Sequence, residues 1–140
     1  PPPARRMMGA LLAAKEAVNL FRQVEDGAGE AAALQELARV YFLKQDLGLA
    51  SDAARESSAV AKAAGNLHAA AQSLLLEAHA HLCKVGTPWD ARGLDDEAAE
   101  ELPEKQALAA ADEASALAEQ FVDTALRESA AAVLEAARSA

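Results

Sequence analysis

The sequence has few of the residues on which several classes of protein depend. Its 140 residues include one cysteine, Cys83, so no disulfide can form within the chain. Aromatic side chains make up only 4% of the residues although 52% are hydrophobic, so a core must be built from Ala, Leu and Val. Alanine has the highest intrinsic helix propensity, and this composition suits closely packed helices better than a sheet.

Basic residues are also scarce, with 13 Lys and Arg against 22 Asp and Glu and a formal net charge of −9. Nucleic-acid binding needs clustered basic groups, so this balance argues against nucleic acid and is compatible with a protein or peptide partner, including a basic one. No apolar run approaches the roughly 20 residues of a membrane span. We therefore expect no transmembrane segment and a soluble protein, of the cytoplasm or of an organelle interior.

The stretch from 29 to 57 carries two helical stripes joined by a short polar link. The first stripe is bulky with one small residue and the second is small throughout: Leu34, Leu37, Ala38 and Tyr41, then Ala50, Ala54 and Ser57. Small residues let helix axes approach closely, and the link over 44–48 has the length that joins antiparallel helices. The stretch is therefore predicted to form a helical hairpin.

This pattern returns after 40 residues. The pairs at that interval come from both helices and from the turn: Ala10 and Ala50, Ala14 and Ala54, Glu16 and Glu56, Asp26 and Asn66, Leu34 and Leu74, Ala38 and Ala78. A third small-residue helix, with Ala107, Ala111 and Ala114, follows its counterpart by 57 residues, so an insertion precedes it. The chain is therefore predicted to be an array of like hairpins.

In the order of its residues the hairpin resembles the tetratricopeptide repeat (TPR) family, whose large, Leu, small, aromatic and Ala positions match Leu34, Leu37, Ala38, Tyr41 and Ala50. The interval exceeds the family's usual repeat of about 34 residues and is similar to that of a longer, 40-residue variant. The resemblance implies an all-α fold, a right-handed α-solenoid of about six helices. It also implies a non-catalytic protein–protein interaction scaffold.

We predict a single helical-repeat domain over 1–140. Its parts are an extended lead-in (1–6), the second helix of a partial hairpin (7–24), hairpin 1 (30–64), hairpin 2 (67–121) with an insertion (84–105), and a terminal helix (124–139). The lead-in follows from the three prolines at the start, which fix φ and lack an N–H donor. Because the first helix of the partial hairpin is missing, we expect a piece of a longer chain or a processed amino terminus.

The resemblance further implies a binding surface, because in the family the first helix of each hairpin lines a concave face. By register, the predicted partner contacts in this groove are Gln35, Arg39, Phe42, Gln72, Leu75, His79 and Leu82. The alternative is that these side chains pack against neighbouring helices. If they form a groove, we expect Arg39→Glu and Leu75→Asp to weaken partner binding while leaving the fold largely intact.

The insertion is the second candidate contact, since long loops in compact domains often carry function. Its predicted partner-binding residues are Trp89, Asp95, Asp96 and Glu97. The alternative is a solvated loop. Use of this segment instead of the groove would indicate a different role, a structural accessory subunit of a large organellar or membrane-associated complex, held by its outer faces and the acidic insertion.

Catalytic and metal-binding patterns are sparse. His79 and Cys83 share a helical face but supply only two of the three or four ligands of a zinc site. Glu77 and His81 lie four residues apart, a spacing that serves a helix-stabilising pair at least as well as acid–base chemistry. The chain has no phosphate-binding loop, nucleophile elbow or Cys-x2-Cys. We therefore predict no enzyme activity, no cofactor and no metal.

Overall fold

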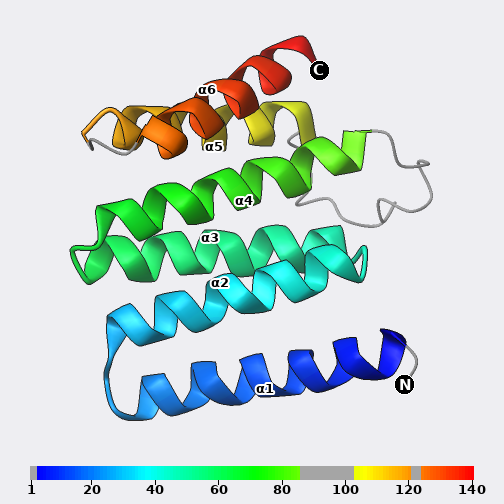
Figure 1. The fold of residues 1–140 in the computed structure, drawn as a ribbon. Helices are drawn as coiled ribbons and strands as arrows, with labels where there is room; N and C mark the ends of the chain where they lie inside the picture. Colours follow the sequence, from blue (N-terminus) through cyan, green and yellow to red (C-terminus); the bar gives the residue numbers. More distant parts are fainter. Residues whose placement is uncertain (1–2, 86–102, 121–123) are drawn as a thin grey trace.

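The computed structural model describes residues 3–85, 103–120 and 124–140, and every regular element in these ranges is an α-helix. The helices are α1 (Pro3–Gln23), α2 (Gly27–Leu43), α3 (Leu47–Ala63), α4 (Leu67–Val85), α5 (Pro103–Ala118) and α6 (Thr124–Ser139). The all-α class predicted from composition is confirmed over these residues. Figure 1 shows the helices stacked in chain order, with α1 at one end and α6 at the other.

The helices make two kinds of contact, between consecutive helices and between alternate helices. Each helix packs against the next one in the sequence, from α1 on α2 to α5 on α6. In addition, α2 contacts α4 and α4 contacts α6, so these three helices form a layer of their own. Because α4 touches α2, α3, α5 and α6, it is the element that ties the two halves of the stack together.

Three turns of one kind join the first four helices. The backbone takes a positive φ at Glu25, Gln45 and Gly65, with values of 57°, 66° and 79°. The N–H of the residue that follows donates to a carbonyl five residues earlier: Asp26 to Phe21 at 3.0 Å, Asp46 to Tyr41 at 2.9 Å, and Asn66 to Ala61 at 2.8 Å. These are left-handed C-terminal caps. They recur every 20 residues, half the interval of the repeat in the sequence.

Two of these turns also cap the next helix. The Asp26 side chain accepts from the Gly29 N–H at 3.0 Å, and the Asn66 side chain accepts from the Ala69 N–H at 3.1 Å. Such a bond satisfies one of the free donors at a helix start. The Asp26 cap lets α2 begin at Gly27, three residues before the predicted start at 30.

The beginning of the chain differs from the prediction. An extended lead-in was expected over 1–6, whereas α1 starts at Pro3 and takes in residues 3–6. Proline is well suited to the first turn of a helix, because its φ is already helical and its missing N–H would have no partner there. The lead-in is therefore wrong for 3–6, and residues 1 and 2 lie outside the described part of the chain.

The core is built mainly from alanine and leucine, as composition predicted. In α2, the predicted stripe is buried: Leu34 and Leu37 are 2% and 9% exposed, and Ala38 and Tyr41 are 0% and 9% exposed. Ala50 and Ala54 of α3 have no exposed surface, so the axes of α2 and α3 run close together. A second cluster fills the space between α4, α5 and α6.

The predicted insertion is shorter at both ends. Lys84 and Val85 complete α4, and residues 103–105 form the first turn of α5, so only 86–102 lie between the helices, outside the described residues. None of the helices in the described ranges combines the length and the apolar character that crossing a bilayer requires.

Candidate partner-binding surface

An open hollow of about 320 Å³ lies on the layer formed by α2, α4 and α6. Leu75 of α4 and Leu126 of α6 are its most buried members, at 9% and 6% exposure, and they form its apolar floor together with the half-buried Leu76. The remaining lining residues are mostly polar: Gln35 and Arg39 of α2, Gln72 and His79 of α4, and Ala125 and Ser129 of α6.

Five of the seven predicted groove residues line this one hollow: Gln35, Arg39, Gln72, Leu75 and His79. Phe42 lies beside them, because its ring meets the His79 ring edge-on with centroids 6.3 Å apart. Leu82 is elsewhere, half-buried against the core shared by α4, α5 and α6. The hollow therefore brings together predicted contacts of two helices that lie 33 to 44 residues apart in the sequence.

Leu75 has a structural role as well, which corrects one expectation. It is 9% exposed and belongs to the core between α4, α5 and α6. Leu75→Asp would place a carboxylate in that core, and an unpaired buried charge costs more than the roughly 2–7 kcal/mol of a neutral polar group. The expectation that this substitution leaves the fold intact is therefore wrong, and Arg39→Glu, at an exposed position, is the cleaner probe.

The electrostatic character of the hollow differs from that of the whole chain. Its lining contains an arginine, a histidine, two glutamines and a serine but no carboxylate, in a chain of net charge −9. Arg39 pairs with Glu36 one helical turn away, where both side chains are at least half exposed. Such exposed pairs hold their partners weakly, typically by about 0–1 kcal/mol, so the guanidinium remains available to another acceptor.

The contribution of α6 was not predicted. Ala125, Leu126 and Ser129 close the hollow on the side away from α2, yet the 40-residue register ends before α6. The only sequence pattern that involves these residues is the apolar spacing of the terminal helix. That spacing indicates a buried face but does not indicate which helices pack against it. The other candidate contacts, Trp89, Asp95, Asp96 and Glu97, lie outside the described residues.

Between α3 and α4 lies a polar network that contains the Glu77 and His81 pair indicated by their four-residue spacing and extends it to residues that the spacing did not reveal. The Glu77 carboxylate, on a side chain 8% exposed, accepts from Arg55 Nε at 3.1 Å and from His81 Nε2 at 3.2 Å. Lys84 Nζ donates to His81 Nδ1 at 3.3 Å and to Ser51 Oγ at 3.0 Å. Each imidazole nitrogen thus has a partner, and the ring carries its proton on Nε2.

Burial lowers the pKa of the Lys84 ammonium, and the nearby Arg55 charge acts in the same direction against the opposing influence of Asp52 and Glu77. Desolvation disfavours the charged form of an amine, so burying the Lys84 ammonium group in this network costs free energy. The network joins α3 to α4 by side chains that all have partners, which indicates a structural role.

A second hollow, of about 730 Å³, opens between α3 and α5 with Leu74 and Glu77 of α4 on its lining. Its charged side chains neutralise one another, since Arg55 pairs with Glu77 and Lys62 pairs with Glu113. The two cations and two carboxylates of its lining balance, so the lining has no net charge that would favour a ligand of one sign. The hollow on α2, α4 and α6 is therefore the stronger candidate.

Within the described ranges, no three His, Cys, Asp or Glu side chains converge on a point where a metal ion could be held. Cys83 is exposed, and the sequence has no second cysteine with which it could form a disulfide. Among known proteins, no family model matches this chain and no curated protein matches it in sequence.

Proposed function

We propose that this protein is a non-catalytic interaction scaffold that binds a peptide or protein segment in the hollow across α2, α4 and α6. In this proposal the stack is a right-handed α-solenoid of TPR-like hairpins, with α2 and α3 as one hairpin and α4 and α5 as the next. The even-numbered helices are then the first helices of their hairpins, and the partner lies across them.

Support for a true repeat comes from two ion pairs among α1, α3 and α5, the helices outside the layer of α2, α4 and α6. Arg22 of α1 pairs with Glu56 of α3, and Lys62 of α3 pairs with Glu113 of α5. Lys62 follows Arg22 by 40 residues and Glu113 follows Glu56 by 57, the same two intervals that relate the alanine stripes. These exposed pairs contribute little stability, but their recurrence supports equivalent placement of α1 to α3 and of α3 to α5.

The observation that carries the proposal is the hollow itself. Five residues of α2 and α4 that the resemblance and the repeat register assigned to a groove line one depression with an apolar floor and a polar rim. Peptide recognition commonly combines apolar pockets that take side-chain anchors with polar groups that fix orientation. The glutamines and Arg39 can bond to the backbone or the carboxylates of a peptide, while Leu75, Leu76 and Leu126 contact its apolar side chains.

The test begins with a displayed library of random peptides selected on the purified protein. The tightest peptide is then titrated calorimetrically into the wild type, Arg39→Glu and Arg138→Glu. Arg138 is the matched control, because it is exposed in the last turn of α6, beyond the α6 residues that line the hollow. We expect at least tenfold weaker binding to Arg39→Glu and unchanged binding to Arg138→Glu. Equal affinity for all three proteins would refute the proposal.

A further inference from the structure

The network between α3 and α4 contains a carboxylate, an imidazole and an amine in a row. The Glu77 carboxylate accepts from His81 Nε2 at 3.2 Å, and His81 Nδ1 accepts from Lys84 Nζ at 3.3 Å. A nucleophile, a base in contact with it and a third group that orients the base form the general pattern of an activated nucleophile. Because Nε2 carries the imidazole proton, the lone pair of Nδ1 faces the amine. The three side chains therefore have the order and the tautomer of that pattern.

The fold holds the base and its orienting group in place. Glu77, His81 and Lys84 follow one another at steps of four and three residues, so they lie on one side of α4. His81 is 1% exposed and Glu77 is 6% exposed, and both are enclosed where α4 packs on α3. From α3, the hydroxyl of Ser51 accepts a second hydrogen bond from Lys84 Nζ, at 3.0 Å. The amine is therefore directed at the imidazole by contacts on two helices.

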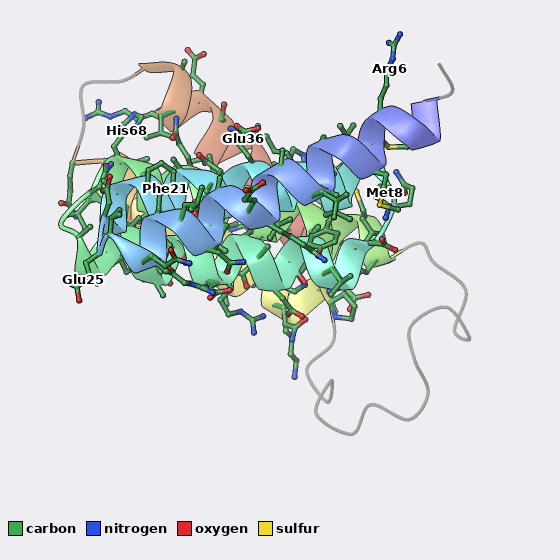
Figure 2. All side chains as sticks on the ribbon, turned by 90° about the horizontal axis from the view of Figure 1, so that it is seen from below. Arg6, Met8, Phe21, Glu25, Glu36 and His68 are labelled. Atoms are coloured by element: carbon green, nitrogen blue, oxygen red, sulfur yellow. The ribbon has the colours of Figure 1, made fainter. Side chains whose placement is uncertain are left out.

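The amine differs from the imidazole in its access to solvent. Lys84 is half-buried, one residue before the end of α4 at Val85. Figure 1 shows that α4 ends and α3 begins at the same end of the stack. Figure 2, which looks onto α1, has Arg6 and Met8 at this end and Glu25 and His68 at the other. The network therefore lies at one end of the helices, with its base inside and its amine at the margin.

The environment of Lys84 also favours the nucleophilic form of its amine. Burial is the main cause that lowers the pKa of Lys84, and the Arg55 charge acts in the same direction. The charges of Asp52 and Glu77 oppose this shift without cancelling it. Only the neutral amine has a lone pair, so a lysine with a lowered pKa is the more reactive nucleophile at neutral pH. The neutral amine can still donate an N–H to His81 Nδ1 while its lone pair points elsewhere.

We infer that Lys84 is a site of covalent acylation, at which its amine takes the acyl group of a thioester and His81 serves as the base. Nζ attacks the carbonyl carbon, the new C–N bond forms, and the C–S bond breaks with its electron pair on sulfur. His81 Nδ1 takes the proton that the nitrogen loses, and Glu77 stabilises the imidazolium through Nε2–H. The proton then passes to the thiolate, so the products are an amide on Lys84 and a free thiol.

A thioester suits a site of this kind because its leaving group needs no acid. An ordinary thiol ionises with a pKa of about 8.5, so a thiolate can leave before it is protonated, and a base for the amine is sufficient. The acylation site shares no residue with the lining of the hollow on α2, α4 and α6. The two proposals therefore stand or fall independently.

The test compares two lysines of the same chain. Lys44 is the matched reference, because it is half-buried like Lys84 but lies 3.8 Å from a carboxylate, that of Asp46. The full chain is incubated with the acetyl thioester of N-acetylcysteamine, hydroxylamine then removes any acetyl group from the Cys83 thiol, and peptide mass spectrometry gives the initial rate at each lysine. At neutral pH we expect acetylation of Lys84 to be at least tenfold faster than that of Lys44. This ratio should fall as the pH rises toward about 10.4, where an ordinary lysine also becomes neutral.

His81→Asn tests the base. The asparagine oxygen can still accept from Lys84 Nζ, but it takes no proton at neutral pH. We expect the Lys84 rate to fall at least tenfold while the Lys44 rate, which also reports on the integrity of the fold, stays the same. A wild-type rate at Lys84 in this variant would overturn the role of His81.

The comparison within the wild type needs no substitution, so it decides the acylation site even where His81→Asn weakens the fold. Acetylation of Lys84 no faster than that of Lys44, or a ratio of the two rates that does not change with pH, would overturn the inference.

Discussion

The Glu77 carboxylate of α4 accepts a hydrogen bond from Arg55 of α3 at 3.1 Å, at a position where the repeat has Leu37 in α2. A second position on the same face of the helix, four residues further on, also differs between the copies, since His81 stands where α2 has Tyr41. The α4 copy has thus exchanged an apolar pair for a polar one, and Arg55 and Lys84 supply the partners that the exchange requires. Because all four groups are connected, the network should respond to single and paired substitutions differently.

Glu77→Leu is therefore expected to destabilise the fold by about 1–3 kcal/mol, because the buried His81 Nε2 donor loses its acceptor. The double variant Glu77→Leu/His81→Tyr recreates the Leu37 and Tyr41 pair of α2 and should lose less than the two single variants together. Urea unfolding followed by circular dichroism measures all four proteins. Strict additivity would show that the two side chains do not act as a unit.

The three turn residues with positive φ give predictions of opposite sign for stability. Introducing glycine at Glu25 or Gln45 should stabilise the protein, and removing glycine at Gly65 should destabilise it. Glu25 and Gln45 pay a steric cost at positive φ of roughly 1–2 kcal/mol each, which glycine avoids. Glu25→Gly and Gln45→Gly should each stabilise the protein, by up to about 1 kcal/mol after the entropy cost of glycine. Gly65→Ala should destabilise it by a similar amount, because an added Cβ there meets no atom and only the backbone angle matters. Unfolding midpoints that move in the same direction for all three variants would contradict the assignment.

Glycine is required at position 29 because of the side chain packed against it, and not because of its own backbone angles. A Cβ at this position would overlap the ring of Phe21, on the helix before it. Gly29→Ala should therefore destabilise the chain by about 1–3 kcal/mol, the usual cost of overpacking. Adding Phe21→Leu, which removes the ring, should recover part of that loss. Gly48→Ala is the control, since a Cβ there has open space and alanine favours the helix. If Gly29→Ala is as well tolerated as Gly48→Ala, the contact is wrong.

How far the sequence predicts this structure depends on the kind of interaction. Helical periodicity located the buried stripe of α2 and the alanines of α3 and α5, because burial of a helix face needs only local spacing. Gly65 stands at its turn for a local reason too, since glycine takes a positive φ without steric cost. Gln45 was not recognised as the same turn, because a non-glycine residue at positive φ carries no such signal.

Interactions between helices were less accessible. Glu77 and His81 were recognised as a pair by their spacing, but Arg55 lies 22 residues before Glu77 and only the packing of α3 on α4 brings it near. Five of the seven predicted groove residues of α2 and α4 line one hollow, since a single register relates the two helices. The α6 residues that complete the hollow have no counterpart in that register. Only the packing of α6 on α4 shows that they line it.

Lys84 predicts a dependence of stability on pH. Its pKa is lowered in the folded state, so between the folded and the unfolded values the unfolded chain binds more protons. Stability at this site is thus reduced at neutral pH, and it rises as pH increases through the folded pKa toward the ordinary lysine value of about 10.4. The difference in unfolding free energy between the wild type and Lys84→Met, which removes the charge, should shift in favour of the wild type as the pH rises from neutral toward about 10.4. A difference that is flat or that falls over this range would show that Lys84 is not desolvated.

The most direct test of the interaction surface is amide hydrogen exchange, measured by mass spectrometry on the wild type with and without the selected library peptide. The account predicts slower exchange in segments 35–42 of α2, 72–79 of α4 and 125–129 of α6, which together contain the hollow. Protection confined to α3 and α5, or to residues 86–102, would contradict the account, because it would place the partner on those helices or on the insertion.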